Sequence, residues 1–239
     1  MNSLYRNRLF WILPALLSLT ACVKDVNPSD SITTASLATT SDGLANAING
    51  AYALFKDHVE FSGSTDQNNM YMRQYFECSD FASDDIVCGQ TTTDPLFYSF
   101  SLGHTATQPN MRYYWYVSYK VINDVNTVIE AAGKVSNPDA GTRQLLGECY
   151  FLRAFTNFNL VKFFGMPYTE SPSAPGIILR TSTTDPTLKA RSTVQEVYQS
   201  IIADAATGAS LMNSSRGVMY GSKEAAWALL SREIGRAHV

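Results

Sequence analysis

Apolar side chains recur along much of the chain at the three-to-four-residue spacing of an amphipathic helix. The first run extends from Leu44 to Phe55, and Ser41 lies just before it, where an N-cap residue is expected. A second run covers residues 110–134, and a third covers residues 147–165. These three runs predict helices that each bury at least one face.

Two further helices are predicted nearer the C-terminus. Thr193 and Glu196 have the spacing of a capping box, in which a hydroxyl and a carboxylate each accept a hydrogen bond from a backbone amide at a helix start. The buried stripe of this helix is expected to contain Val197, Ile201 and Ala205. Another helix begins at Ser222, and a strand-like pattern is confined to residues 176–179. The predicted fold is therefore mainly α.

The third predicted helix, GECYFLRAFTNFNLVKFFG at 147–165, combines six aromatic rings with three charged residues. On a helical wheel one continuous arc is free of polar residues, and it contains Tyr150, Phe151, Ala154, Phe155, Phe158 and Val161. The opposite side mixes apolar residues with Glu148, Arg153 and Lys162. These charges exclude a membrane span, which needs about 20 mainly apolar residues. Apolar residues on two sides favour a core helix between neighbours over a helix that stacks on a ligand.

Residues 60–109 separate the first two predicted helices and lack helical periodicity. Loops of this length are uncommon and are usually functional or disordered. Its aromatic residues include Tyr71, Tyr75, Phe76, Phe81, Phe97, Tyr98 and Phe100. So many rings argue against disorder, and we expect an ordered, irregular loop layer over a helical scaffold.

The N-terminus has the order of an export signal. Arg6 and Arg8 precede an apolar run at 9–19, and Leu-Thr-Ala-Cys follows, ending at Cys22. This ending resembles a bacterial lipobox, in which the cysteine is lipidated and anchors the protein to a membrane without spanning it. An ordinary signal peptide with an incidental cysteine is the alternative. We expect residues 1–21 to be a lipoprotein signal peptide.

Three more segments complete the predicted organisation. Residues 22–40 are rich in Ser, Thr, Asn and Pro and are expected to be a flexible tether. Residues 41–232 are expected to form the helical domain. Residues 233–239 abandon the periodicity of the last helix, and they back-translate to a sequence that resembles a common sequencing adapter. We expect them to be a non-native tail, with the natural protein continuing beyond residue 232.

Composition and charge argue against two classes of function, nucleic-acid binding and metal or cofactor chemistry. The net charge of −3 and the absence of a basic cluster argue against nucleic-acid binding. The three histidines are scattered, without metal-ligand spacing, so no metal and no cofactor is expected. Cys78 and Cys88 have a spacing that could close a short disulfide in an exported protein, whereas Cys149 is expected to be a small buried hydrophobe.

Several motifs together resemble one family. LGECYFLRAF at 146–155, followed by FNLV and FG, resembles a helix of the SusD/RagB-like outer-membrane nutrient-binding lipoproteins. The segments WYVSYKVINDVN at 115–126, ARSTVQEVY at 190–198 and SKEAAWALLSR at 222–232 strengthen the resemblance. It implies a TPR-like helical scaffold with long irregular loops, of which this chain is the N-terminal portion and lacks the C-terminal half.

The resemblance also implies a function. Proteins of this family sit on the surface of the outer membrane through a lipid anchor. They capture a glycan or another oligomeric nutrient for a SusC-like TonB-dependent transporter. A scaffold or lid lipoprotein that binds protein or peptide partners is the alternative.

Candidate ligand-binding residues come from the same resemblance. In the family, a loop around a Ser-Asp-acidic element contacts the ligand, and Ser83 to Asp85 match that element. The candidates beside it are Arg73, Gln90, Phe97 and Tyr98. Because this loop has no tryptophan, stacking on a sugar would fall to Phe97 or Tyr98. The alternatives are loop packing for the rings and a structural ion pair for Arg73.

An acidic cluster in the same loop raises the rival possibility of an enzyme. It consists of Glu77, Asp80, Asp84 and Asp85. Glycosidases hold two carboxylates on opposite sides of a scissile bond, and neighbours in sequence are poor evidence for that placement. A calcium site and a solvated loop with capping aspartates are the other readings. We expect no catalytic residue and a binding protein rather than an enzyme.

Overall fold

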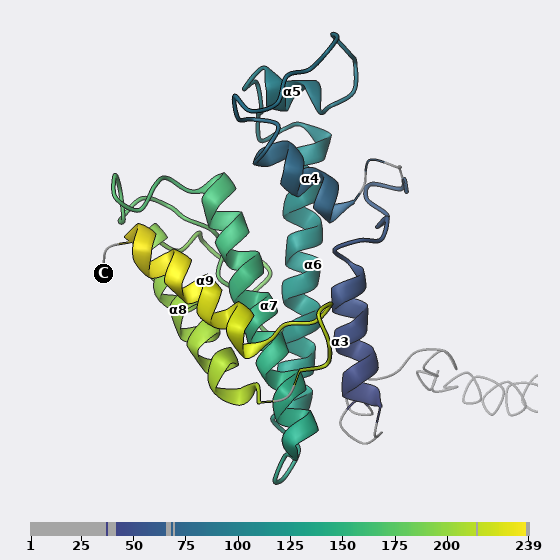
Figure 1. Cartoon of the computed structure of the whole chain (residues 1–239), viewed down its shortest axis with the longest axis vertical. Helices are drawn as coiled ribbons and strands as arrows, with labels where there is room; N and C mark the ends of the chain where they lie inside the picture. Colours follow the sequence, from purple (N-terminus) through teal and green to yellow (C-terminus); the bar gives the residue numbers. More distant parts are fainter. Residues whose placement is uncertain (1–36, 38–41, 66–67, 69, 214, 238–239) are drawn as a thin grey trace, which may run out of the picture. The chain divides into compact units, whose positions relative to one another are not determined.

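The structure is a computed structural model that describes residues 37, 42–65, 68, 70–213 and 215–237 (Figure 1). Its helices are α3 (Gly43–Ala53), α4 (Tyr71–Cys78), α5 (Phe97–Phe100), α6 (Pro109–Ala132), α7 (Ala140–Phe164), α8 (Val194–Leu211) and α9 (Lys223–Ala237). No strand is formed among these residues, and the expectation of a mainly α fold is confirmed. None of the described helices is long and apolar enough to cross a membrane.

Helix α7 lies at the centre of the helical layer. It packs against α6 on one side and α8 on another, α3 contacts both α6 and α7, and α9 packs on α8 (Figure 1). The turn at 133–139 is short, so α6 and α7 run antiparallel. Stacked helix pairs of this kind are the arrangement of a helical solenoid, because each pair covers the apolar face of the next.

Polar residues at the helix starts explain where these helices begin. The Thr193 hydroxyl accepts from the amide of Glu196 at 3.2 Å, and the Glu196 carboxylate accepts from the amide of Thr193 at 2.7 Å, which confirms the capping box. Helix α7 begins seven residues before the GECYFLRAF segment, because the Asp139 carboxylate accepts from the amide of Thr142 at 2.7 Å. Asp42 is the N-cap residue of α3, while Ser41 lies outside the described residues.

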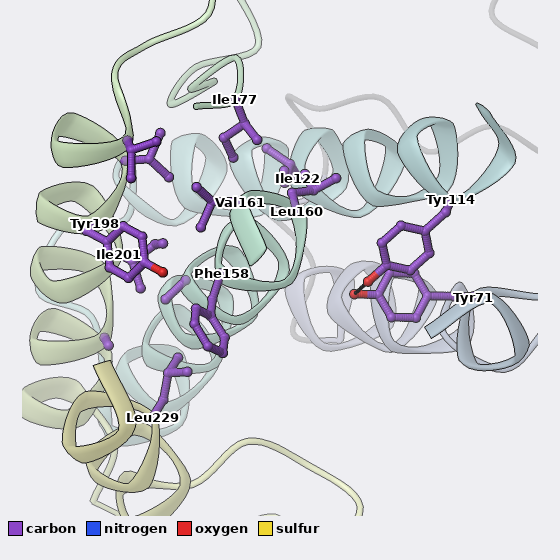
Figure 2. Close-up of a cluster of buried hydrophobic side chains, with 14 of the residues drawn as sticks. Tyr71, Tyr114, Ile122, Phe158, Leu160, Val161, Ile177, Tyr198, Ile201 and Leu229 are labelled. Atoms are coloured by element: carbon purple, nitrogen blue, oxygen red, sulfur yellow. Dashed lines mark hydrogen bonds between the residues drawn. The ribbon is translucent and has the colours of Figure 1, made fainter. Parts of the chain in front are cut away.

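The main hydrophobic cluster joins α4, α6, α7 and α8 (Figure 2). Its buried members include Tyr71, Tyr114, Phe158, Leu160, Val161, Tyr198 and Ile201. The Tyr114 hydroxyl donates to the Tyr71 hydroxyl at 3.0 Å, so two buried phenols satisfy each other. Burial raises the pKa of Tyr71 to about 12. A second cluster on the other side of α7 contains Ile48, Val125, Cys149 and Leu152, and it confirms that Cys149 is buried.

Helix α7 buries more polar residues than the helical wheel predicts. Phe158 is buried as expected, but Phe151 and Phe155 of the apolar arc are only partly buried. Several polar residues are buried instead, namely Glu148, Arg153, Thr156, Asn157 and Asn159. Neighbours surround α7 on several sides and cover these polar residues; Glu148 and Arg153 form ion pairs there, whereas Thr156 Oγ1 and Asn157 Oδ1 have no hydrogen-bond partner among the described residues.

Two short helices correct the expectation that residues 60–109 are irregular throughout. Helices α4 and α5 form within this region, and Tyr71 of α4 belongs to the main core. The Phe81 and Phe100 rings stack at a centroid distance of 5.3 Å with an interplanar angle of 13°. The region is therefore an ordered layer whose rings pack partly on each other.

Other expectations can be placed on the structure. Cys78 and Cys88 are free thiols, so the short disulfide is not formed. The segment 176–179 is not a strand, and its neighbour Pro175 makes one isolated bridge with Thr193. Leu37 is the only described residue within 22–40, and it packs into the second cluster. Helix α9 runs to Ala237, into the segment expected to be non-native.

Phe158→Ala should lower the free energy of unfolding by about 3–5 kcal/mol, because truncating a buried ring removes apolar contacts and leaves a cavity. Chemical denaturation followed by circular dichroism measures the change. Trp227→Ala is the control, since this ring on α9 is more than half exposed and its loss should cost about 0.5 kcal/mol or less. Equal stability of the Phe158 variant and the unsubstituted protein would contradict the core assignment.

Candidate functional site

Arg73 lies on α4 and is held by two carboxylates. Its Nε donates to Glu77 Oε1 at 2.7 Å, and one terminal nitrogen donates to Asp94 Oδ1 at 2.7 Å. Burial works against the charged guanidinium, but the bonds and charges of Glu77 and Asp94 outweigh it and raise the pKa of Arg73. Asp94 also accepts from the amide of Leu96 at 3.0 Å, so Arg73 joins α4 to the start of α5. This is the geometry of the structural ion pair considered as an alternative.

The other three candidates lie in or near α5. Gln90 is exposed, and its carbonyl accepts from the Cys88 thiol at 3.0 Å. Phe97 is half-buried in α5, whereas Tyr98 beside it is 44% exposed. Gln90 and Tyr98 are therefore open to solvent in the loop layer.

The acidic cluster is divided between interior and surface. Glu77 is fully buried and bound by Arg73 and by Asn110 Nδ2 at 3.4 Å, whereas Asp84 and Asp85 are exposed. The Ser83 hydroxyl donates to a backbone carbonyl at 2.7 Å and accepts from the amide of Asp85 at 3.3 Å, which is a local turn. Within the described residues, no three His, Cys, Asp or Glu side chains are placed to hold a metal ion.

A groove of about 800 Å³ runs along the first half of α6. Its wall includes Phe61, Arg112, Trp115, Tyr116, Tyr119, Phe164, Ile178, Arg180 and Arg191. Trp115 lies 5.0 Å from Tyr119 and 5.1 Å from Phe164, measured between ring centroids. Ligand pockets in proteins have volumes of about 300–1,000 Å³, so the groove is large enough for a small ligand or part of a chain.

Sequence reasoning missed this groove, because Trp115 and Tyr119 lie within the apolar run at 110–134, whose periodicity predicts a helix with a buried face. Both residues are only partly buried, and Tyr116 is exposed. A signal was nevertheless present: Arg112, Trp115, Tyr116 and Tyr119 have the spacing i, i+3, i+4 and i+7, which places them on one side of a helix. A cation among rings on one helix side is unusual for a core stripe.

The far wall of the groove is a segment that α6 holds in place. The Tyr119 hydroxyl donates to the carbonyl of Ile178 at 2.8 Å and accepts from the amide of Ile178 at 3.0 Å. Burial raises the pKa of Tyr119, so the phenol stays neutral. Asn126 Nδ2 donates to the carbonyl of Arg180 at 3.2 Å. These bonds fix the backbone that carries Arg180.

A buried ion pair holds the same wall from within. Arg153 donates to both oxygens of Asp204, from Nε and from Nη2, each at 2.7 Å. Its Nη1 donates to Asn126 Oδ1 at 2.8 Å and to the carbonyl of Thr181 at 3.3 Å. Burial opposes the charge of Arg153, but the hydrogen bonds and charge of Asp204 outweigh it and raise the pKa of the guanidinium. One side chain thus links α7 to α6, α8 and the groove wall.

A second hollow adjoins the groove. It has a volume of about 300 Å³, it shares Phe61 and Arg112 with the groove, and Arg73 lies in its wall. The Arg112 guanidinium lies over the Phe61 ring at 5.6 Å from the centroid. Gln90 and Tyr98 are not among the described residues that line either hollow. The structure thus brings Arg73 next to the groove and leaves Gln90 and Tyr98 apart from both linings.

The structure is thus a mainly α scaffold of stacked helices that carries a ring-lined groove. The chain belongs to the SusD-like family described as "Starch-binding associating with outer membrane", which it matches over residues 24–233. This membership confirms the family that the sequence motifs resemble.

Individual relatives agree with the family. A SusD-like protein of Formosa agariphila is 29% identical over 92 residues, which make up 38% of this chain and 17% of that protein. A SusD superfamily structure from Bacteroides thetaiotaomicron is 28% identical with a TM-score of 0.66, over 82% of this chain and 42% of that one. Another from Bacteroides fragilis, 22% identical, has a TM-score of 0.70 over 83% and 46%. The chain therefore spans less than half the length of these relatives.

Asp204→Asn should lower the free energy of unfolding by about 3–5 kcal/mol, because it leaves the Arg153 guanidinium buried without its counter-charge. Urea denaturation measures the loss. Lys56→Met is the control, since it removes one partner of an exposed ion pair and should change stability by about 1 kcal/mol or less. If both variants are equally stable, the buried pair does not hold the helices together.

Proposed function

We propose that this protein is a surface-exposed outer-membrane lipoprotein, anchored through Cys22, that binds a glycan or another oligomeric nutrient. It passes the ligand to a SusC-like TonB-dependent transporter. Membership of a starch-binding family supports glycan binding and the outer-membrane location. The Leu-Thr-Ala-Cys ending of the N-terminal apolar run supports the lipid anchor, although it lies outside the described residues.

The ring-lined groove is the observation that carries this proposal. Sugars have apolar faces that stack on flat rings, and Trp115, Tyr116 and Tyr119 offer such rings along one side of α6. The groove is open to solvent, so an extended oligomer can enter it from the side. We propose binding without a chemical step: in the acidic cluster of the loop layer, Glu77 is buried and held by Arg73, whereas Asp84 and Asp85 lie at the surface, which does not suit two carboxylates opposed across a scissile bond.

We propose a secondary role for the loop layer. In this role Tyr98, Phe97 and Gln90 contact parts of a long ligand that extend beyond the groove, and the exposure of Gln90 and Tyr98 supports it. Arg73 acts from the wall of the adjoining hollow, where its two carboxylate partners limit it to orienting the loop and donating its remaining N–H groups.

Trp115→Ala should weaken binding of the best polysaccharide ligand by about tenfold or more, equivalent to about 1.4 kcal/mol, because it removes the largest ring of the groove. Affinity gels loaded with a panel of polysaccharides identify the ligand, and calorimetry measures the dissociation constant. Tyr98→Ala, in the loop layer, should have a smaller effect on binding and little effect on stability.

Trp227→Ala is the matched control for the groove variant. It removes an exposed tryptophan on α9, away from the groove, and should leave binding unchanged. Thermal melts of all the variants separate lost binding from lost folding. If no polysaccharide binds while a TonB-dependent transporter still co-purifies, the scaffold or lid role replaces glycan capture. Release of reducing sugar from a bound glycan would instead point to an enzyme.

Cys22→Ala should abolish incorporation of radiolabelled fatty acid and move the protein from the membrane to the soluble fraction, because the thiol is the proposed acylation site. Cys88→Ala is the control, since this free cysteine lies in the loop layer and should leave labelling intact. Continued labelling of the Cys22 variant would contradict the lipid anchor.

A further inference from the structure

The groove carries three positive charges and no negative one. Arg112, Arg180 and Arg191 all lie in its wall, and no carboxylate is among the described residues that line it. The groove is therefore positively charged, although the chain as a whole has a net charge of −3. A local excess of positive charge in a concave surface attracts anions, because the low-dielectric walls focus the field.

The groove arginines differ from three others in how they are satisfied. Arg73, Arg153 and Arg216 each form an ion pair with a carboxylate, at distances of 3.0 Å or less. By contrast, Arg112, Arg180 and Arg191 form no ion pair within the described part of the chain. The Asp185 carboxylate, in the turn that follows Arg180, accepts hydrogen bonds from Lys189 and from the amides of Thr181 and Ser182 instead.

Backbone carbonyls hold two of the groove arginines in place. Arg191 donates from Nε to the carbonyl of Gly176 at 2.6 Å and from Nη2 to the carbonyl of Phe164. Arg180 donates to the carbonyls of Pro186 and Thr187, each at 2.9 Å. Carbonyls are neutral acceptors, so they orient the guanidinium groups without removing the positive charge. Several N–H groups of each remain for a ligand, because a guanidinium has five.

Arg112 is the third arginine of the groove. Its side chain is exposed and lies over the Phe61 ring, between the groove and the adjoining hollow. It is seven residues before Tyr119 on the same side of α6, and Trp115 lies between them. A cation is thus placed at one end of a row of rings, with Arg180 and Arg191 on the opposite wall.

We propose that the groove binds an acidic glycan, one whose sugar units carry carboxylate or sulfate groups. This inference rests on the proposed function and names its ligand class. The rings stack on the sugar faces, and the arginines bind the anionic groups, whose planar or tetrahedral oxygens match the guanidinium fork. A neutral glycan would leave the three guanidinium groups of the wall without an anionic partner, so we expect the groove to prefer an acidic ligand.

Binding to matched pairs of polysaccharides tests the proposal. One pair is polygalacturonate and its fully methyl-esterified form, which share a backbone and differ in carboxylate charge. The other is chondroitin sulfate and its desulfated form, which distinguishes sulfate from carboxylate. The full chain in detergent solution should bind at least one acidic form about tenfold more tightly than its matched partner at 50 mM salt. The preference should shrink at 0.5 M salt, because screening weakens the contacts of exposed Arg112.

Arg112→Gln is the decisive variant, because its guanidinium has no carboxylate or carbonyl partner among the residues that the structure describes. It should reduce the preference for the acidic form about threefold or more while sparing affinity for the neutral form. Arg143→Gln is the charge-matched control on α7, outside the groove, and should keep the preference. Trp115→Ala should weaken both forms.

The outcomes distinguish the proposal that the protein captures a glycan from the proposal that the glycan is acidic. Equal affinity for acidic and neutral forms, or an unchanged preference in Arg112→Gln, overturns the acidic ligand and leaves glycan capture standing. Binding of no polysaccharide at all overturns both. Equal binding of polyglutamate and the acidic glycans overturns the glycan class, since it would make the groove a general anion site.

Discussion

The buried ion pair between Arg153 and Asp204 is the interaction on which the arrangement depends. Removing two charges from water is costly, and the cost is offset only when geometry is good and the remaining N–H groups are bonded. Here the pair is bidentate, and Asn126 and Thr181 take the remaining contacts. The full set of contacts therefore forms only when α6, α7, α8 and the segment at 178–181 have one particular position along each other, which is called the register below. It makes that register specific.

Close packing of the same helices reinforces this register. A Cβ on Gly208 of α8 would lie 2.9 Å from the carbonyl oxygen of Gly147 on α7, so any larger residue would push the helices apart. The two backbones can therefore approach closely at one end, while Arg153 and Asp204 bridge them further along. The groove benefits indirectly, because its far wall is attached to these helices through Thr181 and Asn126. Recognition in a preorganised wall loses less conformational entropy when a ligand binds.

The sequence predicted the long helices well, since each buries a repeating apolar stripe and the Thr193 capping box marks a start by local chemistry. It did not predict the burial of Arg153, because a helical wheel gives the faces of a helix and not the number of its neighbours. Helices α4 and α5 are short, at 8 and 4 residues, so their periodicity is too brief to recognise. The groove was missed for a related reason: Trp115 and Tyr119 fit a core stripe until the neighbouring wall is known.

The groove and the loop layer differ in the groups they can recognise, because their arginines have different partners. Arg73, the cation of the loop layer, contacts the carboxylates of Glu77 and Asp94, so an anion approaching it also meets two negative groups. Its fixed position suits neutral hydroxyls better than acids. Within the described part of the chain, Arg180 and Arg191 donate to backbone carbonyls and form no ion pair, so an anion approaching them meets no paired carboxylate. A long ligand that crosses from groove to loop would therefore be held by its anionic groups at α6 and by its hydroxyls at α4 and α5. Under our proposal, specificity for charge resides in the helical scaffold, and the loops add contacts without deciding the ligand class.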